Sequence, residues 1–355
     1  MGARSIKIAA VGATVALFAG ATPGQAAVGS RYRARMAVRY LVENQMNDGS
    51  VPGFSAVGST ADSILAFVAA KRGPGAMDDA LNYLAEHEQD IDDVGEKAKV
   101  VLALVAAGAE PRDWEKRDLV AEIENAEVNG HYGQLPASLV FDQALAILAL
   151  RAAGDTVPDR VIDWLVDAQC GNGGWQFDQP SSPDDNKRCY NAGASTTDYN
   201  VADTNTTSYV IQSLVANGGE EISLPGRPWS FLKKARDPIK RGWVFAPQFA
   251  CGRNQEPPEC SASDTNSTSL VIQAYTARNK ALPAGARKAL RGLQRRLCGG
   301  NAGGFAVSWI DDDGKLVKGP PDVGATVGAV LGLLEEPLPL RATSDLEPAP
   351  DARKC

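Results

Sequence analysis

The chain has 355 residues, of which 44% are apolar and 22% charged, a composition that can bury a substantial core and excludes a disordered or fibrous protein. Its formal net charge of −7 argues against nucleic acid or an anionic lipid surface as a partner. Two histidines and no Cys-x-x-Cys spacing argue against a zinc site, so we expect no metal.

Residues 1–27 have the three parts of a secretory signal. Arg4 and Lys7 precede an apolar run, and small residues follow it, which predicts cleavage after Ala26 or Ala27. The apolar run is short and interrupted by glycine, which disfavours a stable membrane anchor. We therefore expect a secreted protein.

Export makes disulfides the expected state of the six cysteines. Two pairs of cysteines flank long polar loops, so local pairing would close each loop, and the remaining pair would tie down the C-terminal tail. The predicted disulfides are Cys170–Cys189, Cys251–Cys260 and Cys298–Cys355.

An apolar helical pattern recurs six times along the chain, centred on Ile64, Val101, Ile147, Ile211, Ile272 and Val330. The clearest copies are the strings 203–214 and 264–275, which are almost identical. Four of the six copies have Asp eight residues before the centre, where an N-cap would stand, and four have Thr four residues before it.

More polar, amphipathic helices alternate with these copies, at 33–45, 77–89, 118–127, 159–169, 228–235 and 285–297. Six alternating pairs predict an all-α protein, an α6/α6 toroid with the apolar helices inside, as one domain over residues 28–336. Residues 337–355 form an acidic tail that contains proline. Long inserts precede the last three inner helices and should emerge at one mouth of the ring, where binding sites are commonly placed.

Several amphipathic helices end in a glycine turn followed by an aromatic residue, and the best example is 169–175, Gln-Cys-Gly-Asn-Gly-Gly-Trp. This turn is similar to the QW motif of triterpene cyclases. With the helix strings, it resembles the prenyltransferase and squalene oxidase repeat proteins of the terpenoid cyclase superfamily. The resemblance covers nearly the whole mature chain and implies a toroid.

Class II cyclases of that superfamily protonate their substrate with the middle Asp of an Asp-x-Asp-Asp-Thr-Ala string. On this sequence the middle position falls on Asn205 and Asn266, and an amide cannot supply such a proton. A literal Asp-Ile-Asp-Asp string at 90–93 leaves a class II terpene cyclase open as an alternative, with Asp92 or Asp93 as the acid. Capping and solvation are the competing interpretation, and only 6% of residues are aromatic, few for holding carbocations.

The helix starts are more similar to those of the transcobalamin and intrinsic factor group, which is secreted and binds rather than reacts. In that group cobalamin lies between the toroid and a small β domain, for which little chain remains after Leu334. We therefore expect no cofactor, with a corrinoid left open.

Our main hypothesis is a secreted, non-catalytic protein that holds a small apolar or corrinoid-like ligand, or a protein partner, at the mouth. A secreted polysaccharide-degrading enzyme, with two mouth carboxylates as acid and base, is a further alternative. Capping is the competing interpretation of the aspartates among the candidate ligand-binding residues, which are Asp93, Asp203, Asn205, Asp264, Asn266, Asp322, Gln212 and Gln273.

Overall fold

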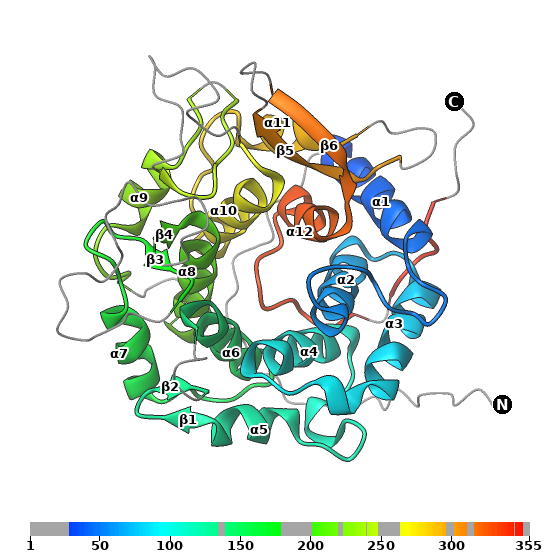
Figure 1. The fold of residues 1–355 in the computed structure, drawn as a ribbon, viewed down its shortest axis with the longest axis vertical. Helices are drawn as coiled ribbons and strands as arrows, with labels where there is room; N and C mark the ends of the chain where they lie inside the picture. The colour runs from blue at the N-terminus through cyan, green and yellow to red at the C-terminus, as the bar shows by residue number, and fades with distance from the viewer. Residues whose placement is uncertain are drawn as a thin grey trace.

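The computed structural model describes residues 28–133, 139–178, 201–218, 223–238, 240–247, 263–295, 302–310, 316–343 and 345–350. The predicted signal at 1–27 therefore lies outside the described residues. Within them, six helices form an inner ring in chain order (Figure 1): α2 (Ala56–Ala70), α4 (Val94–Ala107), α6 (Val140–Ala152), α8 (Thr204–Gly218), α10 (Thr265–Ala277) and α12 (Val323–Leu334).

Outer helices pack against this ring and alternate with the inner helices along the chain. They are α1 (Val28–Glu43), α3 (Pro74–Glu86), α5 (Leu119–Asn125), α7 (Asp159–Asp167), α9 (Pro228–Lys234) and α11 (Ala286–Leu293). Two short 3-10 helices, η1 (Glu88–Asp90) and η2 (Pro111–Asp113), lie between them. The last inner helix, α12, packs against the first, α2, so the ring is closed and the predicted α6/α6 toroid is confirmed.

The repeated Asp and Thr residues of the inner helices stabilise the fold. Four aspartates are N-caps whose carboxylates accept a backbone N–H three residues later, at 2.7 to 2.8 Å: Asp93, Asp203, Asp264 and Asp322. In three copies the Thr four residues before the centre holds the glycine turn. The hydroxyls of Thr207, Thr268 and Thr326 accept the backbone N–H groups of Trp175, Trp243 and Phe305 at 2.8 to 3.0 Å.

The glutamine of the glycine turn links one repeat to the next. The Gln169 amide donates to the Pro225 carbonyl oxygen, just before α9, at 3.0 Å. Gln294 donates in the same way to Arg33 of α1 at 2.9 Å, which ties the last repeat to the first. The turn glycine then lies against the neighbouring backbone: Gly303 has a φ of +93°, and a Cβ there would come within 2.0 Å of the Met36 carbonyl oxygen.

Three two-stranded antiparallel sheets lie in the connections: β1 (Glu127–Val128) with β2 (His131–Tyr132), β3 (Trp175–Gln176) with β4 (Ala202–Asp203), and β5 (Phe305–Ile310) with β6 (Leu316–Asp322). In the last two sheets, the aromatic of the glycine turn pairs with the capping Asp, Trp175 with Asp203 and Phe305 with Asp322. The inserts of repeats 4 and 6 therefore begin and end at the start of an inner helix, as the sequence predicted.

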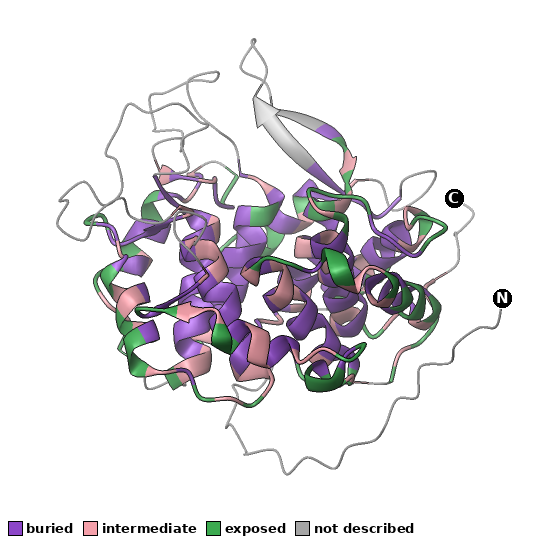
Figure 2. Cartoon of the chain, turned by 60° about the horizontal axis from the view of Figure 1, so that its bottom comes forward, coloured by how far each residue is buried: buried purple, intermediate pink, exposed green. Residues whose placement is uncertain are grey.

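The core lies between and within the two rings, and the inner helices are largely buried (Figure 2). Within the described residues, none of the helices combines the length and apolar character needed to cross a membrane. Part of the C-terminal tail, whose three acidic residues are balanced by three basic ones, joins this core. Leu338 and Leu340 are buried, and the chain then runs past the ends of α4 and α2, where Thr343 and Glu347 bond to Ala106 and Lys71.

Candidate functional site

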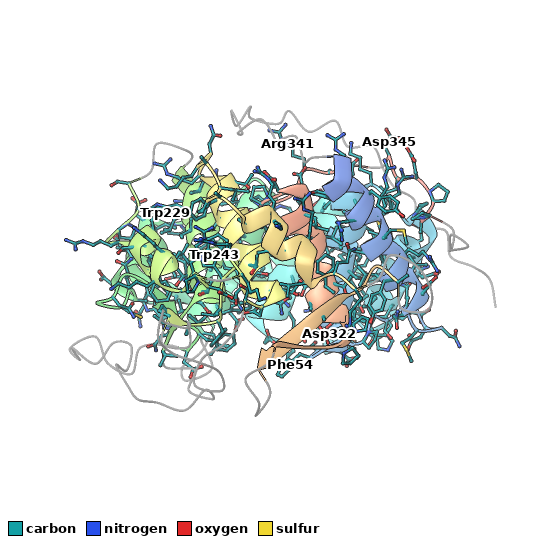
Figure 3. The ribbon with its side chains drawn as sticks, turned by 90° about the horizontal axis from the view of Figure 1, so that it is seen from above. Phe54, Trp229, Trp243, Asp322, Arg341 and Asp345 are labelled. Atoms are coloured by element: carbon teal, nitrogen blue, oxygen red, sulfur yellow. The ribbon has the colours of Figure 1, made fainter. Side chains whose placement is uncertain are left out.

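The inner helices begin at one end of the ring, which we call the mouth, and the C-terminal segment crosses the other end. Figure 3 shows the ring edge-on, with Phe54 and Asp322 at the mouth and Arg341 and Asp345 at the opposite end. Solvent reaches the inner helices in their first two turns and at their last residues, whereas the turns between are buried. A site on the inner side of the ring therefore lies at the mouth.

Charged side chains gather there on three neighbouring inner helices. Lys99 of α4 forms an ion pair with Asp62 of α2, with 2.7 Å between Nζ and Oδ2. The two side chains are 23% and 30% exposed, so the pair is partly covered but open to solvent. Burial alone would lower the pKa of Lys99, but the charges of Asp62, Asp142 and Glu96 together raise it above its ordinary value.

Asp142, in the first turn of α6, is the chemically distinctive member. It is half-buried, and within the described residues its carboxyl group has no hydrogen bond and no ion pair. The carboxyl lies over Gly95 of α4, where a Cβ would meet its Oδ1 at 2.3 Å, so only glycine leaves this space free. Burial, with the negative charge of Asp93, raises the pKa of Asp142 to about 7 against the opposing charge of Lys99.

Tyr209 of α8 completes the group from the opposite side of the ring. The negative charge of Asp62 on α2 acts on the Tyr209 hydroxyl. Because α2 and α8 stand three places apart in a ring of six, this interaction requires both side chains to face the inner side of the ring. Burial, with that charge, raises the pKa of Tyr209. Phe141 packs edge-on against Tyr209, with 5.1 Å between ring centroids. We call Asp62, Glu96, Lys99, Asp142 and Tyr209 the mouth cluster.

Glu96 is held in this cluster by its neighbour on α2. The hydroxyl of Ser55, which also caps α2 by accepting the Gly58 N–H at 3.1 Å, donates to the Glu96 carboxylate. The first turns of α2, α4 and α6 are thus joined side by side, through Ser55 with Glu96 and Gly95 with Asp142.

The predicted site residues are mostly engaged in holding the ring together. Burial raises the pKa of two of the four capping aspartates, Asp264 and Asp203. For Asp203, which is 1% exposed, it raises the pKa to about 7. Gln212 accepts the Leu338 N–H at 2.9 Å, so its carbonyl oxygen is occupied by the chain's own C-terminal segment. Gln273 is buried and donates to the Ser269 hydroxyl at 3.3 Å.

Asn266 and Asn205 remain close to the mouth. Asn266 is exposed in the first turn of α10, with its Oδ1 beside Gly328 of α12, and Asn205 is half-buried in the first turn of α8. Neither asparagine hydrogen-bonds to the mouth cluster, but both stand on the same end of the ring.

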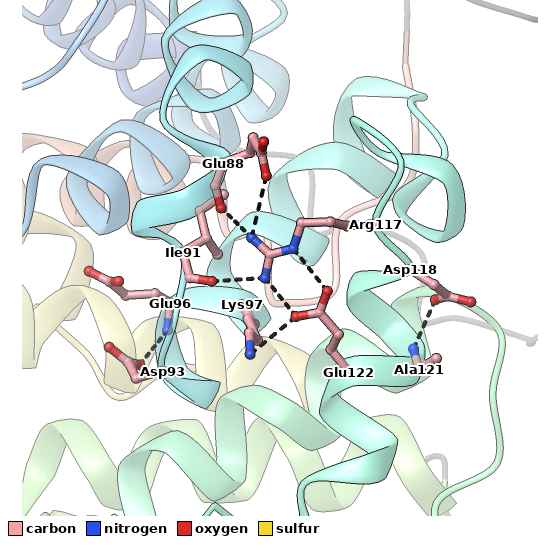
Figure 4. A network of polar contacts seen from close by, with 9 residues as sticks. All are labelled: Glu88, Ile91, Asp93, Glu96, Lys97, Arg117, Asp118, Ala121 and Glu122. Atoms are coloured by element: carbon pink, nitrogen blue, oxygen red, sulfur yellow. Dashed lines mark hydrogen bonds and ion pairs between the residues drawn. The ribbon is translucent and has the colours of Figure 1, made fainter.

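The acidic string at 90–93 is fixed from outside the ring (Figure 4). Arg117 donates to the carbonyl oxygens of Glu88 and Ile91 and forms an ion pair with Glu122 of α5 at 2.6 Å. Asp92 is exposed, and its charge acts on Arg117 rather than on the mouth cluster, whereas Asp93 caps α4 and lies near enough to Asp142 to raise its pKa.

Cys170 is buried and is half of a disulfide. The other five cysteines lie outside the described residues, so the predicted pairings Cys170–Cys189, Cys251–Cys260 and Cys298–Cys355 stay predictions. Over the described ranges, no group of three or more His, Cys, Asp or Glu side chains is placed to hold a metal ion.

Sequence reasoning missed the mouth cluster, although the repeat frame contained a signal for it. Asp62, Lys99 and Tyr209 all stand two residues before the centre of their copies, at Ile64, Val101 and Ile211. Glu96 and Asp142 both stand five residues before their centres. A charged or phenolic residue at the same position in several otherwise apolar helices indicates the helix face that points to the inner side of the ring.

The sequence matches no family model and no curated protein. Solved structures with this fold exist, and the three described here are distant in sequence. One is the type II terpene cyclase MstE from Scytonema, with geranylgeranyl dihydroxybenzoate as its substrate, at 13% identity and a TM-score of 0.54, covering 87% of this chain and 97% of that one. Another is a novel alpha-amylase from Clostridium perfringens, at 10% identity and a TM-score of 0.56, covering 87% and 99%.

Haptocorrin in complex with Cbi is a third, at 13% identity and a TM-score of 0.52, covering 94% of this chain and 74% of that one. At these identities the likeness shows the fold alone. The protein is therefore an α/α toroid of the kind that terpene cyclases have, and what its site does must be argued from its own residues.

Proposed function

We propose that the mouth cluster is an acid–base catalytic site for a polar, hydroxyl-bearing substrate, with Asp142 as the residue that holds the mobile proton. One observation carries this proposal: a half-buried carboxyl group with a pKa of about 7 lies in the same cluster as the ion-paired carboxylate of Asp62. Neighbouring carboxyl groups in such different surroundings are the usual basis for one acid and one base at neutral pH.

The charge of the cluster favours a neutral or cationic substrate, because Lys99 is its single cation and three of its members are acids. The buried middle of the ring favours a substrate held at the mouth over a long apolar chain held deep inside. Glycosides suit both conditions. The alpha-amylase of Clostridium perfringens supports this class only as an example of the fold with that chemistry.

In such a reaction Asp142 gives its proton to the leaving glycosidic oxygen as the carbon–oxygen bond breaks. A water molecule then adds to the sugar carbon, and its proton passes to a carboxylate of the cluster, Asp62 or Glu96. Lys99 holds Asp62 in place, and Ser55 holds Glu96. Tyr209 and Phe141 offer ring surface beside Asp142 on which a sugar can lie.

The test is release of reducing ends from a panel of neutral oligosaccharides, including maltoheptaose, cellohexaose and xylohexaose. Asp142→Asn should lower kcat on any substrate that is turned over by at least about 100-fold, because the amide has no proton of suitable acidity. The matched control, Asp163→Asn on the exposed side of α7, should keep full activity. Full activity in Asp142→Asn would overturn the role given to this residue.

A class II terpene cyclase is the second candidate, and the likeness of the fold to type II terpene cyclases supports it. Incubation with geranylgeranyl diphosphate and geranylgeranyl dihydroxybenzoate, followed by mass spectrometry, separates it from a glycosidase. A cyclic product lost in Asp142→Asn would support a cyclase that uses the mouth cluster. A product lost instead in Asp92→Asn or Asp93→Asn would support the string at 90–93.

A secreted, non-catalytic binding protein remains the third candidate, and the haptocorrin complex supports it as an example of this fold holding a ligand. Native mass spectrometry of the protein purified from culture supernatant tests both parts of that hypothesis. Recovery of a mature chain beginning near residue 27 with a retained small molecule, and no turnover of either substrate class, would favour it over an enzyme.

A further inference from the structure

The outer wall of the ring has a basic side that the acidic net charge conceals. From residue 265 to residue 310 the sequence contains no aspartate or glutamate, and neither does the stretch from 28 to 42. These two stretches include α11 and α1, which pack together through Gln294 and Arg33. The outer helix before them, α9, ends in Lys233 and Lys234, both exposed.

The three helices form one continuous surface. In Figure 1, α9, α11 and α1 follow one another around the outer wall of the ring, and connecting segments lie between α9 and α11. Arg236, after α9, donates to the Ala284 carbonyl oxygen just before α11, and the Arg241 side chain lies against Gly285. We call the outer surface of α9, α11 and α1 with these joining loops the basic band.

Among the residues that the structure describes, few acids balance the band. Asp237, the acid between residues 223 and 247, is 3% exposed and is used internally, where it accepts the N–H groups of Lys240 and Ser263. Glu43 pairs with Arg39 at the end of α1, and Glu335, which follows α12, pairs with Arg287. The exposed cations Arg31, Arg35 and Lys288 have no described carboxylate within ion-pair distance.

At both joints between these helices, the guanidinium group of one arginine donates to the backbone carbonyl oxygen of another at 3.4 Å, Arg33 to Arg291 and Arg236 to Arg241. Burial and the positive charge of Arg291 lower the pKa of Arg33, and burial and the charge of Arg241 lower that of Arg236. The like charges of these arginines repel one another, and an anion bound between the helices would reduce that repulsion. The repulsion at two separate joints indicates a surface arranged for an anionic ligand that spans all three helices.

From this arrangement we propose that the basic band binds a linear anionic polysaccharide. A polymer fits a convex wall along which cations are spaced over three helices, whereas a single small anion would occupy one joint. The exposed large apolar side chains within the described residues are Met46, Phe54 and Val128, and the band has none of them. It therefore has no strongly exposed apolar side chain for insertion into a lipid surface, and its aromatic residues Tyr32 and Trp229 are only partly exposed, with Trp229 packed against Tyr275. This inference is independent of the mouth cluster and of its chemistry.

The test is the affinity of the full-length mature protein for heparin, a sulfated polysaccharide, measured by isothermal calorimetry at 50 and 200 mM NaCl. The band variant combines Arg31→Gln, Arg35→Gln and Lys288→Gln. The control combines Lys71→Gln, Arg112→Gln and Lys116→Gln, three exposed cations outside the band, so both lose the same charge. We expect wild type to bind heparin, and the band variant to bind at least about tenfold more weakly at 50 mM NaCl, with a shallower salt dependence.

The control variant should stay within about twofold of wild type. An equal loss in both variants would show a net-charge effect and overturn the proposal, as would a wild type that does not bind heparin at 50 mM NaCl. Tighter binding to a DNA duplex or to phosphatidylglycerol vesicles than to heparin would also overturn it. Thermal unfolding checks that the band variant is folded, and Lys233→Gln with Lys234→Gln repeats the test on α9.

Discussion

Two aspartates illustrate how one residue type can stabilise the fold in one place and supply chemistry in another. Asp203 and Asp142 both have a pKa of about 7, but Asp203 is 1% exposed and bonds the start of its own helix, whereas Asp142 is half-buried at the mouth with no described partner. The sequence predicted the caps because the string repeats. It did not predict Asp142, whose pKa depends on Gly95 and Asp93 of the neighbouring helix.

The raised pKa of Asp203 makes stability depend on pH in a defined direction. Burial raises this pKa from 3.8 to about 7, so the folded chain holds the proton more tightly than the unfolded chain does. The contribution is complete below about pH 4 and is lost as the pH rises through 7, at a cost of up to about 4 kcal/mol. Asp203→Asn keeps an oxygen for the Thr206 N–H and removes the titration.

We expect the free energy of unfolding of Asp203→Asn to gain on that of wild type between pH 4 and pH 8, measured by urea denaturation at several pH values. The exposed control Asp163→Asn should follow the pH dependence of wild type. Parallel curves for wild type and Asp203→Asn would contradict the assignment of a buried, titrating carboxyl group to this position.

At the scale of the elements, the glycine turns explain why the positions of the outer helices could be predicted from the sequence. The clearest turn combines a glutamine amide, a glycine with positive φ and an aromatic residue, Gln169, Gly173 and Trp175, so its sequence is easily recognised. The inner face has no such motif. An aliphatic residue on an inner helix can either pack against the outer helices or face the inner side of the ring. The mouth cluster could therefore be found only by aligning the repeats.

Gly303 tests this account of the turns. Gly303→Ala would place a methyl group within 2.0 Å of the Met36 carbonyl oxygen at a φ of +93°, where the backbone of α1 cannot easily move away. We expect a loss of about 2–4 kcal/mol in the free energy of unfolding, measured by urea denaturation.

The matched control is Gly292→Ala within α11, where a Cβ would meet no atom within 4 Å. Gly292 is the second-last residue of α11, so alanine there should stabilise the protein by no more than about 0.5–1 kcal/mol, the gain expected in a helix interior. If the two substitutions have the same effect, the turn glycine is not the point at which the last repeat meets the first.

For the whole molecule, closure of the ring is what brings the mouth cluster together. Its members come from α2, α4, α6 and α8, which span the chain from Asp62 to Tyr209 and face one another only in a closed circle. The sequence predicted the closed circle from the six copies. It could not predict that α2, α4 and α6 carry the charges while α10 and α12 carry none there, because each helix alone has an ordinary composition.

The most direct test of the acid–base site is the titration of Asp142 itself, followed by carbon-13 NMR of protein labelled at the aspartate carboxyl groups. The signals are assigned by their loss in Asp142→Asn and Asp203→Asn. We predict that the Asp142 carboxyl titrates near pH 7, as its surroundings require. Titration of Asp142 below pH 5 would contradict the claim that the ring holds a proton donor at its mouth.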